Sequence, residues 1–147
     1  MTLKDYKMYS VEKVKADRCN MSLMKLSQYN SQKDPAMCFV GVTTSKSFVN
    51  RVFSSWVEII GVNANLIGLD LALDSSVDIY RSVVNSIKSN DMILGSLVTS
   101  HKTNIYQYCN GLFDIITPGS EYLKEMGVIY KDGKQLACDA TDPDAQM

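Results

Sequence analysis

Short apolar runs alternate with segments of helical periodicity along most of this chain. The run Met37–Val42 is continuously apolar, as expected for a strand that is covered on both faces. Between Val49 and Ile60 the apolar residues are instead three and four positions apart, on one stripe of a helix that Gly61 can end. Strands separated by helices of roughly ten residues or more pair in parallel through right-handed crossovers. The alternation therefore predicts an α/β fold.

The same alternation continues after this first pair. Residues 64–69 and 93–98 have the character of short buried strands. The capping signal Asp74-Ser75-Ser76-Val77-Asp78 lies between them and precedes a helix with four apolar positions on one face: Tyr80, Val83, Val84 and Ile87. A further helix is expected from Ser100, with Ile105, Cys109 and Leu112 on one side.

The C-terminal part has the signals of a short helix and a hairpin. Thr117 as N-cap and Pro118 as first helical residue predict a helix that ends near Gly127. Residues 128–131 and 134–138 form a predicted β-hairpin joined through Asp132-Gly133. The hairpin adds an antiparallel element, so we expect a three-layer αβα domain with a mixed, mostly parallel sheet. We place this domain at residues 37–147, after an N-terminal arm of residues 1–36.

Composition restricts the classes of function. A chain of 147 residues that is 46% hydrophobic can bury one core. Its net charge of -1 argues against a nucleic-acid partner, and no apolar run reaches the roughly 20 residues that span a bilayer. The four cysteines have no metal-ligand spacing, and a single histidine cannot complete a zinc site. Without an N-terminal apolar segment that would direct secretion, we expect the reducing cytoplasm.

Polar residues follow three of the predicted strands. Ser45 and Ser47 come after the first, Lys102 after the third and Asp142 after the hairpin. In open α/β sheets ligands bind beyond the carboxyl ends of the strands. The sequence therefore predicts one site that contains these four residues, and its serines lie at a helix N-terminus that favours an anion.

Each of these residues also has a simpler interpretation. Ser45 or Ser47 can serve only as a helix cap, a role that is compatible with anion binding. Lys102 can be a surface lysine, and Asp142 can belong to an acidic solvated tail. Lys46 either adds charge to the pocket or faces water. His101 is interpreted as a neighbour that shapes the loop, because side chains at adjacent positions usually point apart.

Three segments together resemble the substrate-binding domain of the shikimate dehydrogenase family. They are residues 39–47, with Ser45-Lys46-Ser47, residues 93–102, which end at Lys102, and residues 133–143, with Thr141-Asp142. The resemblance covers roughly residues 37 to 143. It implies that the Ser-x-Ser turn holds a substrate carboxylate, that Lys102 and Asp142 handle the proton of the oxidised carbinol, and that Thr99 contacts the substrate. It also implies a role in aromatic amino acid biosynthesis.

The chain departs from the family pattern at several positions. Residues 97–102 correspond to the family's Asn-Val-Thr-x-Pro-x-Lys but are one residue shorter and lack the Asn and the Pro. Near residues 127–131 the family has an Asn that binds a ring hydroxyl, and this chain has none. Ala140 and Phe48 also replace a family Asn and Pro. Fewer polar partners favour a cyclic hydroxy acid that is less oxygenated than shikimate or carries different substituents.

No Gly-x-Gly-x-x-Gly sequence is present, because no two of the eight glycines are two residues apart. We therefore expect that this chain binds no dinucleotide, and that NAD or NADP would be held by a domain of about 100 further residues that is missing from it. Three interpretations follow. The chain is part of a shikimate dehydrogenase-like oxidoreductase, a cofactor-free domain that binds a small hydroxy carboxylate, or an interaction module that forms a homo-oligomer through its N-terminal arm or an exposed sheet edge.

Overall fold

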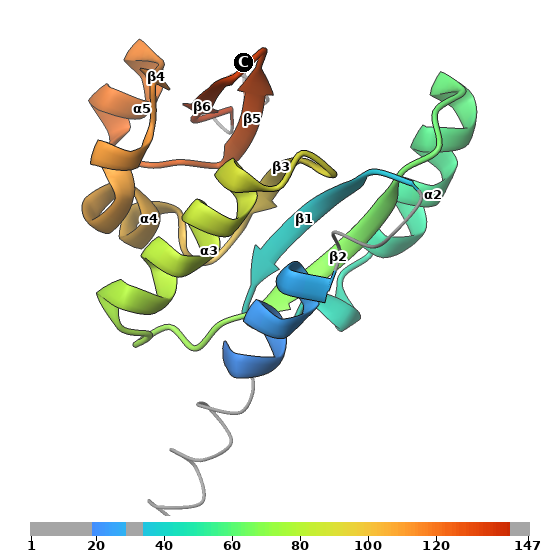
Figure 1. Cartoon of the computed structure of the whole chain (residues 1–147), viewed down its shortest axis with the longest axis horizontal. Helices are drawn as coiled ribbons and strands as arrows, with labels where there is room; N and C mark the ends of the chain where they lie inside the picture. Colours follow the sequence, from blue (N-terminus) through green and yellow to red (C-terminus); the bar gives the residue numbers. More distant parts are fainter. Residues whose placement is uncertain (1–18, 29–33, 142–147) are drawn as a thin grey trace, which may run out of the picture.

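The computed structural model describes residues 19–28 and 34–141, and a six-stranded sheet forms the centre of this part (Figure 1). The strands are β1 (Ala36–Gly41), β2 (Asn65–Asp70), β3 (Ile93–Val98), β4 (Ile115–Ile116), β5 (Val128–Asp132) and β6 (Gln135–Asp139). Their order in the sheet is β2-β1-β3-β5-β6-β4. β5 is antiparallel to both of its neighbours, and the other pairs are parallel. The predicted mixed, mostly parallel sheet is confirmed.

The helices begin close to their predicted positions. They are α2 (Val49–Ile60), α3 (Val77–Ser89), α4 (Lys102–Cys109) and α5 (Pro118–Leu123), with 3-10 turns η2 (Thr44–Lys46) and η3 (Asn110–Leu112). Ser76 and Thr117 are the N-caps of α3 and α5, and the side chain of each accepts a hydrogen bond from a backbone N–H three residues on. α5 ends before the predicted Gly127, because Lys124 adopts the left-handed conformation with φ 57°.

Two details of the C-terminal region differ from the sequence prediction. Asp132 pairs with Gln135, so the hairpin turn consists of Gly133 and Lys134 and not of Asp132-Gly133. Only Gly133 of these two has a positive φ, of 59°, as the first position of a type II′ turn requires. β4 was not predicted, because its two residues are too few to carry a pattern and it forms only by pairing with β6.

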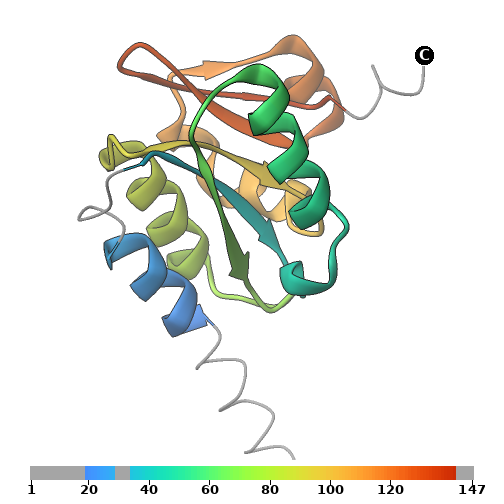
Figure 2. The same cartoon turned by 90° about the vertical axis from the view of Figure 1, so that its right-hand side faces the viewer.

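The main core lies between one face of the sheet and three helices, which are α3, α4 and a helix formed by residues 19–28. The four predicted apolar residues of α3 are all buried there. The helix of residues 19–28 lies beside α3 (Figure 2) and buries Cys19 and Leu26 in the same cluster. Part of the predicted N-terminal arm thus packs on the domain, while the boundary at residue 36 stays a prediction.

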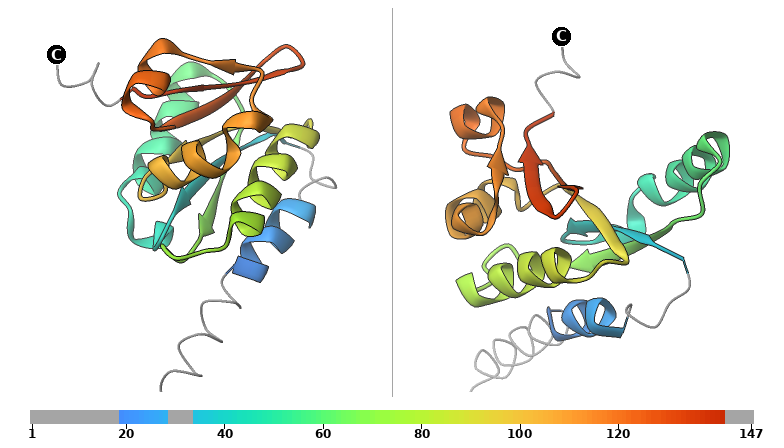
Figure 3. Two further views of the ribbon diagram at one scale, coloured as in Figure 1. Left: turned by 90° about the vertical axis from the view of Figure 1, so that its left-hand side faces the viewer. Right: turned by 45° about the horizontal axis from the view of Figure 1, so that its top comes forward.

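α2 lies on the opposite side of β1 and β2 from α3 and the helix of residues 19–28 (Figure 3). Its predicted bounds are confirmed, and Gly61 ends it with φ 77°. However, no residue of α2 is buried. The apolar stripe that predicted the helix is therefore only partly covered by the sheet.

The four cysteines at positions 19, 38, 109 and 138 are free thiols and are all buried. Burial raises the pKa of Cys38 to about 12 and the pKa values of Cys109 and Cys138 to about 11. These three thiols are therefore protonated at neutral pH and act as small apolar side chains. Within residues 19–28 and 34–141, no helix combines the length and the hydrophobicity that crossing a membrane requires.

A matched pair of substitutions tests this assignment of the core. Leu69 in β2 is completely buried, whereas Leu73 in the following loop is 60% exposed. We expect Leu69→Ala to lower the free energy of unfolding by about 2 to 5 kcal/mol, because it removes buried methyl groups and leaves a cavity. Leu73→Ala should change it by less than about 0.5 kcal/mol. Urea unfolding followed by circular dichroism measures both, and equal effects of the two substitutions would contradict this packing.

Candidate functional site

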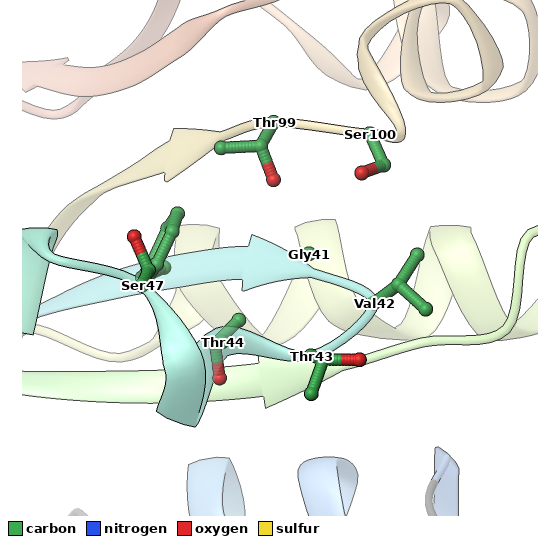
Figure 4. Close-up of a pocket in the computed structure, with 8 residues that line it drawn as sticks. Gly41, Val42, Thr43, Thr44, Ser47, Thr99 and Ser100 are labelled. Carbon is green, nitrogen blue, oxygen red and sulfur yellow. The ribbon is translucent and has the colours of Figure 1, made fainter.

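A pocket of about 320 Å³ lies where β1 and β3 end (Figure 4). These two parallel strands are neighbours, so the loops that follow them meet at one edge of the sheet. Five of the eight lining residues carry hydroxyl groups and none is charged. The lining residues are Phe39, Gly41, Val42, Thr43, Thr44, Ser47, Thr99 and Ser100.

Gly41 allows the two hydroxyl-bearing segments to approach each other. A Cβ atom at this position would lie 2.9 Å from Oγ1 of Thr99 and 3.1 Å from Cγ2 of Thr44. The first of these distances is shorter than carbon–oxygen contacts normally are, so a larger residue would push the β3 loop away. The pocket therefore depends on the absence of a side chain at the end of β1.

The turn after β1 is held by hydrogen bonds from two other elements. One carboxylate oxygen of Asp70, at the end of β2, accepts from the backbone N–H of Thr44 at 2.8 Å and from its hydroxyl at 2.7 Å. The side-chain amide of Asn50, in α2, donates to the carbonyl oxygens of Thr44 and Ser47 at 2.8 and 3.1 Å. These bonds hold η2 in this conformation without a ligand.

The two serines of the predicted Ser-x-Ser turn occupy different positions. Ser47 lines the pocket, and its hydroxyl oxygen accepts a hydrogen bond of 3.2 Å from the backbone N–H of Val49 at the start of α2. The N-cap of α2 is Phe48, without a side-chain cap bond, so Ser47 satisfies the first helical N–H from the position before the cap. This bond leaves the hydroxyl proton of Ser47 for a ligand. Ser45 is exposed on η2 and does not line the pocket.

Thr99 lies across the pocket from Ser47, on the segment that leaves β3 (Figure 4). Its hydroxyl donates to the carbonyl oxygen of Val40 at 3.2 Å. The backbone N–H of Thr99 donates to the same oxygen at 3.0 Å. In this arrangement the hydroxyl oxygen can still accept a hydrogen bond from a ligand.

Lys102 is half-buried at the start of α4, two residues after the lining residue Ser100, and its side chain lies near Gly127. Its Cε atom and the backbone nitrogen of Thr141 would each lie 3.9 Å from a Cβ atom at Gly127. Thr141, the residue before Asp142, therefore lies near Lys102 beside Gly127. Asp142 itself lies outside the described residues, and the predicted roles of the pair stay predictions.

His101 is completely buried and joins four parts of the fold. Its Nε2 atom lies 3.2 and 3.0 Å from the carbonyl oxygens of Gly41 and Leu71, and its Nδ1 atom lies 2.7 Å from the hydroxyl of Tyr80. The side-chain amide of Asn104 donates to the same hydroxyl at 3.0 Å. The network thus ties the ends of β1 and β2 to α3 and α4, directly behind the pocket.

The partners of His101 determine its protonation. Carbonyl oxygens only accept, so Nε2 carries the proton, and Tyr80 donates to Nδ1. If Nδ1 were also protonated, it would have to donate to the Tyr80 oxygen, which already accepts a hydrogen bond from Asn104. Burial lowers the pKa of His101 below its usual 6.5, and the bonds to the two carbonyls oppose this only in part. The ring is therefore neutral at neutral pH, and its hydrogen bonds hold the ends of β1 and β2 in place beside the pocket.

Sequence reasoning missed several residues of this site. Thr43, Thr44 and Ser100 line the pocket, and Asp70 with Asn50 holds its turn. The density of hydroxyl residues directly after β1 and β3 was the available signal for the first three. The sequence contains no signal for Asp70, since it acts on a residue 26 positions away.

The geometry suits a small anion. The hydroxyl of Ser47 can donate to a ligand, because it only accepts a bond within the chain. α2 and α4 both begin two positions after lining residues, Ser47 and Ser100, so the dipoles of these helices add partial positive charge. Among the described residues, no cluster of metal-ligating side chains is found.

Neither a family model nor a sequence relative of established function matches the chain. Solved structures do match it. Shikimate 5-dehydrogenase from Listeria monocytogenes, in complex with shikimate and NAD, has a TM-score of 0.65 at 16% identity, over 78% of this chain and 37% of the enzyme. Shikimate dehydrogenase 1 from Peptoclostridium difficile has a TM-score of 0.60 at 21% identity, over 74% of this chain and 38% of the enzyme.

This chain has the fold of part of a shikimate dehydrogenase. The same fold occurs in 5-ketofructose reductase of Gluconobacter sp. strain CHM43, with a TM-score of 0.63 at 12% identity over 78% of this chain. The chain spans less than two-fifths of the length of these enzymes. The predicted resemblance to shikimate dehydrogenase is therefore confirmed at the level of the fold.

The buried imidazole makes stability depend on pH. The pKa of His101 is lower in the folded chain than in the unfolded chain, where it is about 6.5. The stabilisation that the neutral ring provides is therefore complete above pH 6.5 and declines as the pH falls below that value. One such group changes the unfolding free energy by at most about 1.4 kcal/mol per pH unit. His101 is the only histidine, so urea unfolding of untagged protein between pH 7.5 and 5 measures the effect.

His101→Gln is the control for this experiment. It should be less stable than the wild type at pH 7.5, because glutamine cannot reproduce all three hydrogen bonds. Its stability should then change less between pH 7 and 5, since the titrating group is gone. Identical pH dependence of the two proteins would show that His101 is not the responsible group.

Proposed function

We propose that this chain is the substrate-binding domain of a shikimate dehydrogenase-like NAD(P)-dependent oxidoreductase. The reaction is the oxidation of the CH–OH group of a cyclic hydroxy acid, or its reverse. The observation that supports this proposal is the hydroxyl-lined pocket at the ends of β1 and β3, with Lys102 two residues after the lining residue Ser100. The fold shared with shikimate dehydrogenases supports it further.

The substrate carboxylate binds the turn after β1 in this proposal. Ser47 donates its hydroxyl proton, and the N-termini of α2 and α4 add partial positive charge. The exposed Ser45 contacts only a ligand that extends over η2. Thr99 accepts a hydrogen bond from a substrate hydroxyl, because its own proton is donated to Val40.

Lys102 and Asp142 act on the carbinol. A nicotinamide held by a further domain would supply the acceptor for the hydride of the carbinol carbon, and the hydroxyl proton would then have to leave. Lys102 receives this proton in oxidation and returns it in reduction, and Asp142 orients the ammonium group. The approach of Thr141 to Gly127, beside Lys102, is consistent with this pairing.

The substrate has fewer ring hydroxyls than shikimate. In the segment where the family has the Asn that binds a ring hydroxyl, Ile129 is completely buried in the core and Val128 is apolar. Neither side chain can pair with a hydroxyl group. A substrate hydroxyl placed against them would lose its hydrogen bonds to water without replacement.

The alternative function is binding of a small hydroxy carboxylate without redox chemistry. It is favoured by the same pocket, which needs no nucleotide to hold an anion. The two functions differ in one measurable respect, since only the first requires NAD or NADP. Structures of shikimate dehydrogenases with NADP or NAD support the cofactor assignment for the oxidoreductase function. Four free thiols are compatible with the reducing cytoplasm as the compartment.

Substitution of Lys102 tests the site. Shikimate, quinate and simpler cyclohexene carboxylates are first screened by thermal shift, and the best ligand is titrated by calorimetry. We expect Lys102→Ala to weaken binding tenfold to a hundredfold, because it removes a charge-assisted hydrogen bond of roughly 1.5 to 3 kcal/mol. Lys134→Ala, at the exposed hairpin tip, is the control and should bind as the wild type does. Equal affinity of all three proteins would exclude Lys102 from the site.

The chain by itself should not bind a dinucleotide. It has no glycine-rich turn that would let a pyrophosphate approach a helix N-terminus. Titration of the purified chain with NAD and NADP, with and without the carboxylate ligand, should give no saturable heat in the micromolar range. Saturable binding would show that the nucleotide site lies within this chain and would overturn the division into two domains.

A further inference from the structure

α2 exposes an apolar surface that is unusual for a soluble domain. Phe48, just before the helix, is 66% exposed, and Ile59 and Ile60 near its end are 82% and 70% exposed. Trp56 between them is 49% exposed. Contiguous exposed apolar side chains of this size mark contact surfaces.

These side chains form one continuous strip. Residues 48, 52, 56 and 59 are spaced by four, four and three positions and therefore lie along one side of the helix. Val52 is half-buried at the inner border of the strip, and Phe53 and Val57 are half-buried beyond it, so the strip is the outward part of the apolar side of the helix. It extends along the whole helix, which at 12 residues is about 18 Å long.

Two exposed charges flank the strip in a symmetric arrangement. Arg51 and Glu58 are seven residues apart, so both lie on the same edge of the strip. Arg51 is in the first turn of α2 and Glu58 in the last, at equal distances from the middle of the helix. Neither forms an ion pair with another residue of the described ranges. When two such helices pack antiparallel, Arg51 of each copy faces Glu58 of the other.

We propose that α2 is a self-association surface, on which a second copy of this chain packs its own α2 in antiparallel orientation about a two-fold axis. Such an isologous contact buries the apolar strip of both copies and forms two Arg51–Glu58 ion pairs. This surface differs from the N-terminal arm and the sheet edge, and the proposal does not rest on the proposed enzymatic function.

The charge pattern favours a second copy over a lipid surface. Helices that lie on membranes carry Lys and Arg on their polar side, which attract anionic lipids. The polar side of α2 has one Arg, one Glu, Ser54, Ser55 and Asn50, so it has no net charge. It is therefore complementary to itself and not to an anionic surface.

Exchange of the two charges tests the proposal. Sedimentation velocity from low to high micromolar concentration should show a monomer–dimer equilibrium for the wild type. Arg51→Glu and Glu58→Arg should each weaken dimerisation at least tenfold, because each places like charges together at both contacts. An equimolar mixture of the two variants should dimerise again, since each then offers the charge that the other needs. Lys134→Glu, in the exposed turn between β5 and β6 and outside α2, is the control and should dimerise as the wild type does.

A second variant separates loss of association from loss of folding. Ile59→Glu places a charge in the strip at a highly exposed position, so it should abolish the dimer and leave the circular dichroism spectrum and the midpoint of urea unfolding of dilute protein unchanged. A wild-type protein that stays monomeric at all concentrations would overturn the proposal. Single charge variants that dimerise normally, a mixture that fails to recover, or binding of the monomer to anionic vesicles through α2 would overturn it as well.

Discussion

The buried imidazole of His101 connects the elements on which the site depends. Its two nitrogens bind the ends of β1 and β2 and the hydroxyl of Tyr80 in α3, and His101 itself precedes α4. Without it, the carbonyl of Leu71 would lose a buried hydrogen bond at a cost of about 1 to 3 kcal/mol. The carbonyl of Gly41 and the hydroxyl of Tyr80 would each keep one other bond, from the N–H of Leu71 and from Asn104. The position of Lys102, the next residue in the chain, follows directly from this anchor.

The pocket is preorganised by bonds that leave donors and acceptors for a ligand. Asp70 and Asn50 hold the turn after β1, and Val40 accepts both bonds from Thr99. Because these groups are already ordered, binding of a small anion does not have to fix them at its own entropic cost. The missing side chain of Gly41 keeps the two loops close enough to enclose a ligand.

The two faces of the sheet are covered unequally. α3, α4 and the helix of residues 19–28 cover one face and share one cluster of buried side chains. On the other side α2 has no buried residue, although it is strongly amphipathic in sequence. An α/β sheet normally has helices packed over both faces. The part of the chain that the structure describes thus leaves this layer incomplete, and the apolar strip of α2 stays uncovered.

Features that depend on neighbouring residues were determined by the sequence alone. The cap and the four buried residues of α3, the end of α2 at Gly61 and the strand β3 all follow from periodicity and turn chemistry within about a dozen residues. The predicted positions of Ser47 and Lys102 after parallel strands follow from the same patterns. Only the tertiary structure decided that Asp70 holds Thr44, that His101 is buried and that α2 stays exposed. The first two features depend on contacts between residues that are 26 to 60 positions apart in the sequence, and the third depends on which surface stays uncovered. A local sequence pattern does not specify which distant segments come into contact.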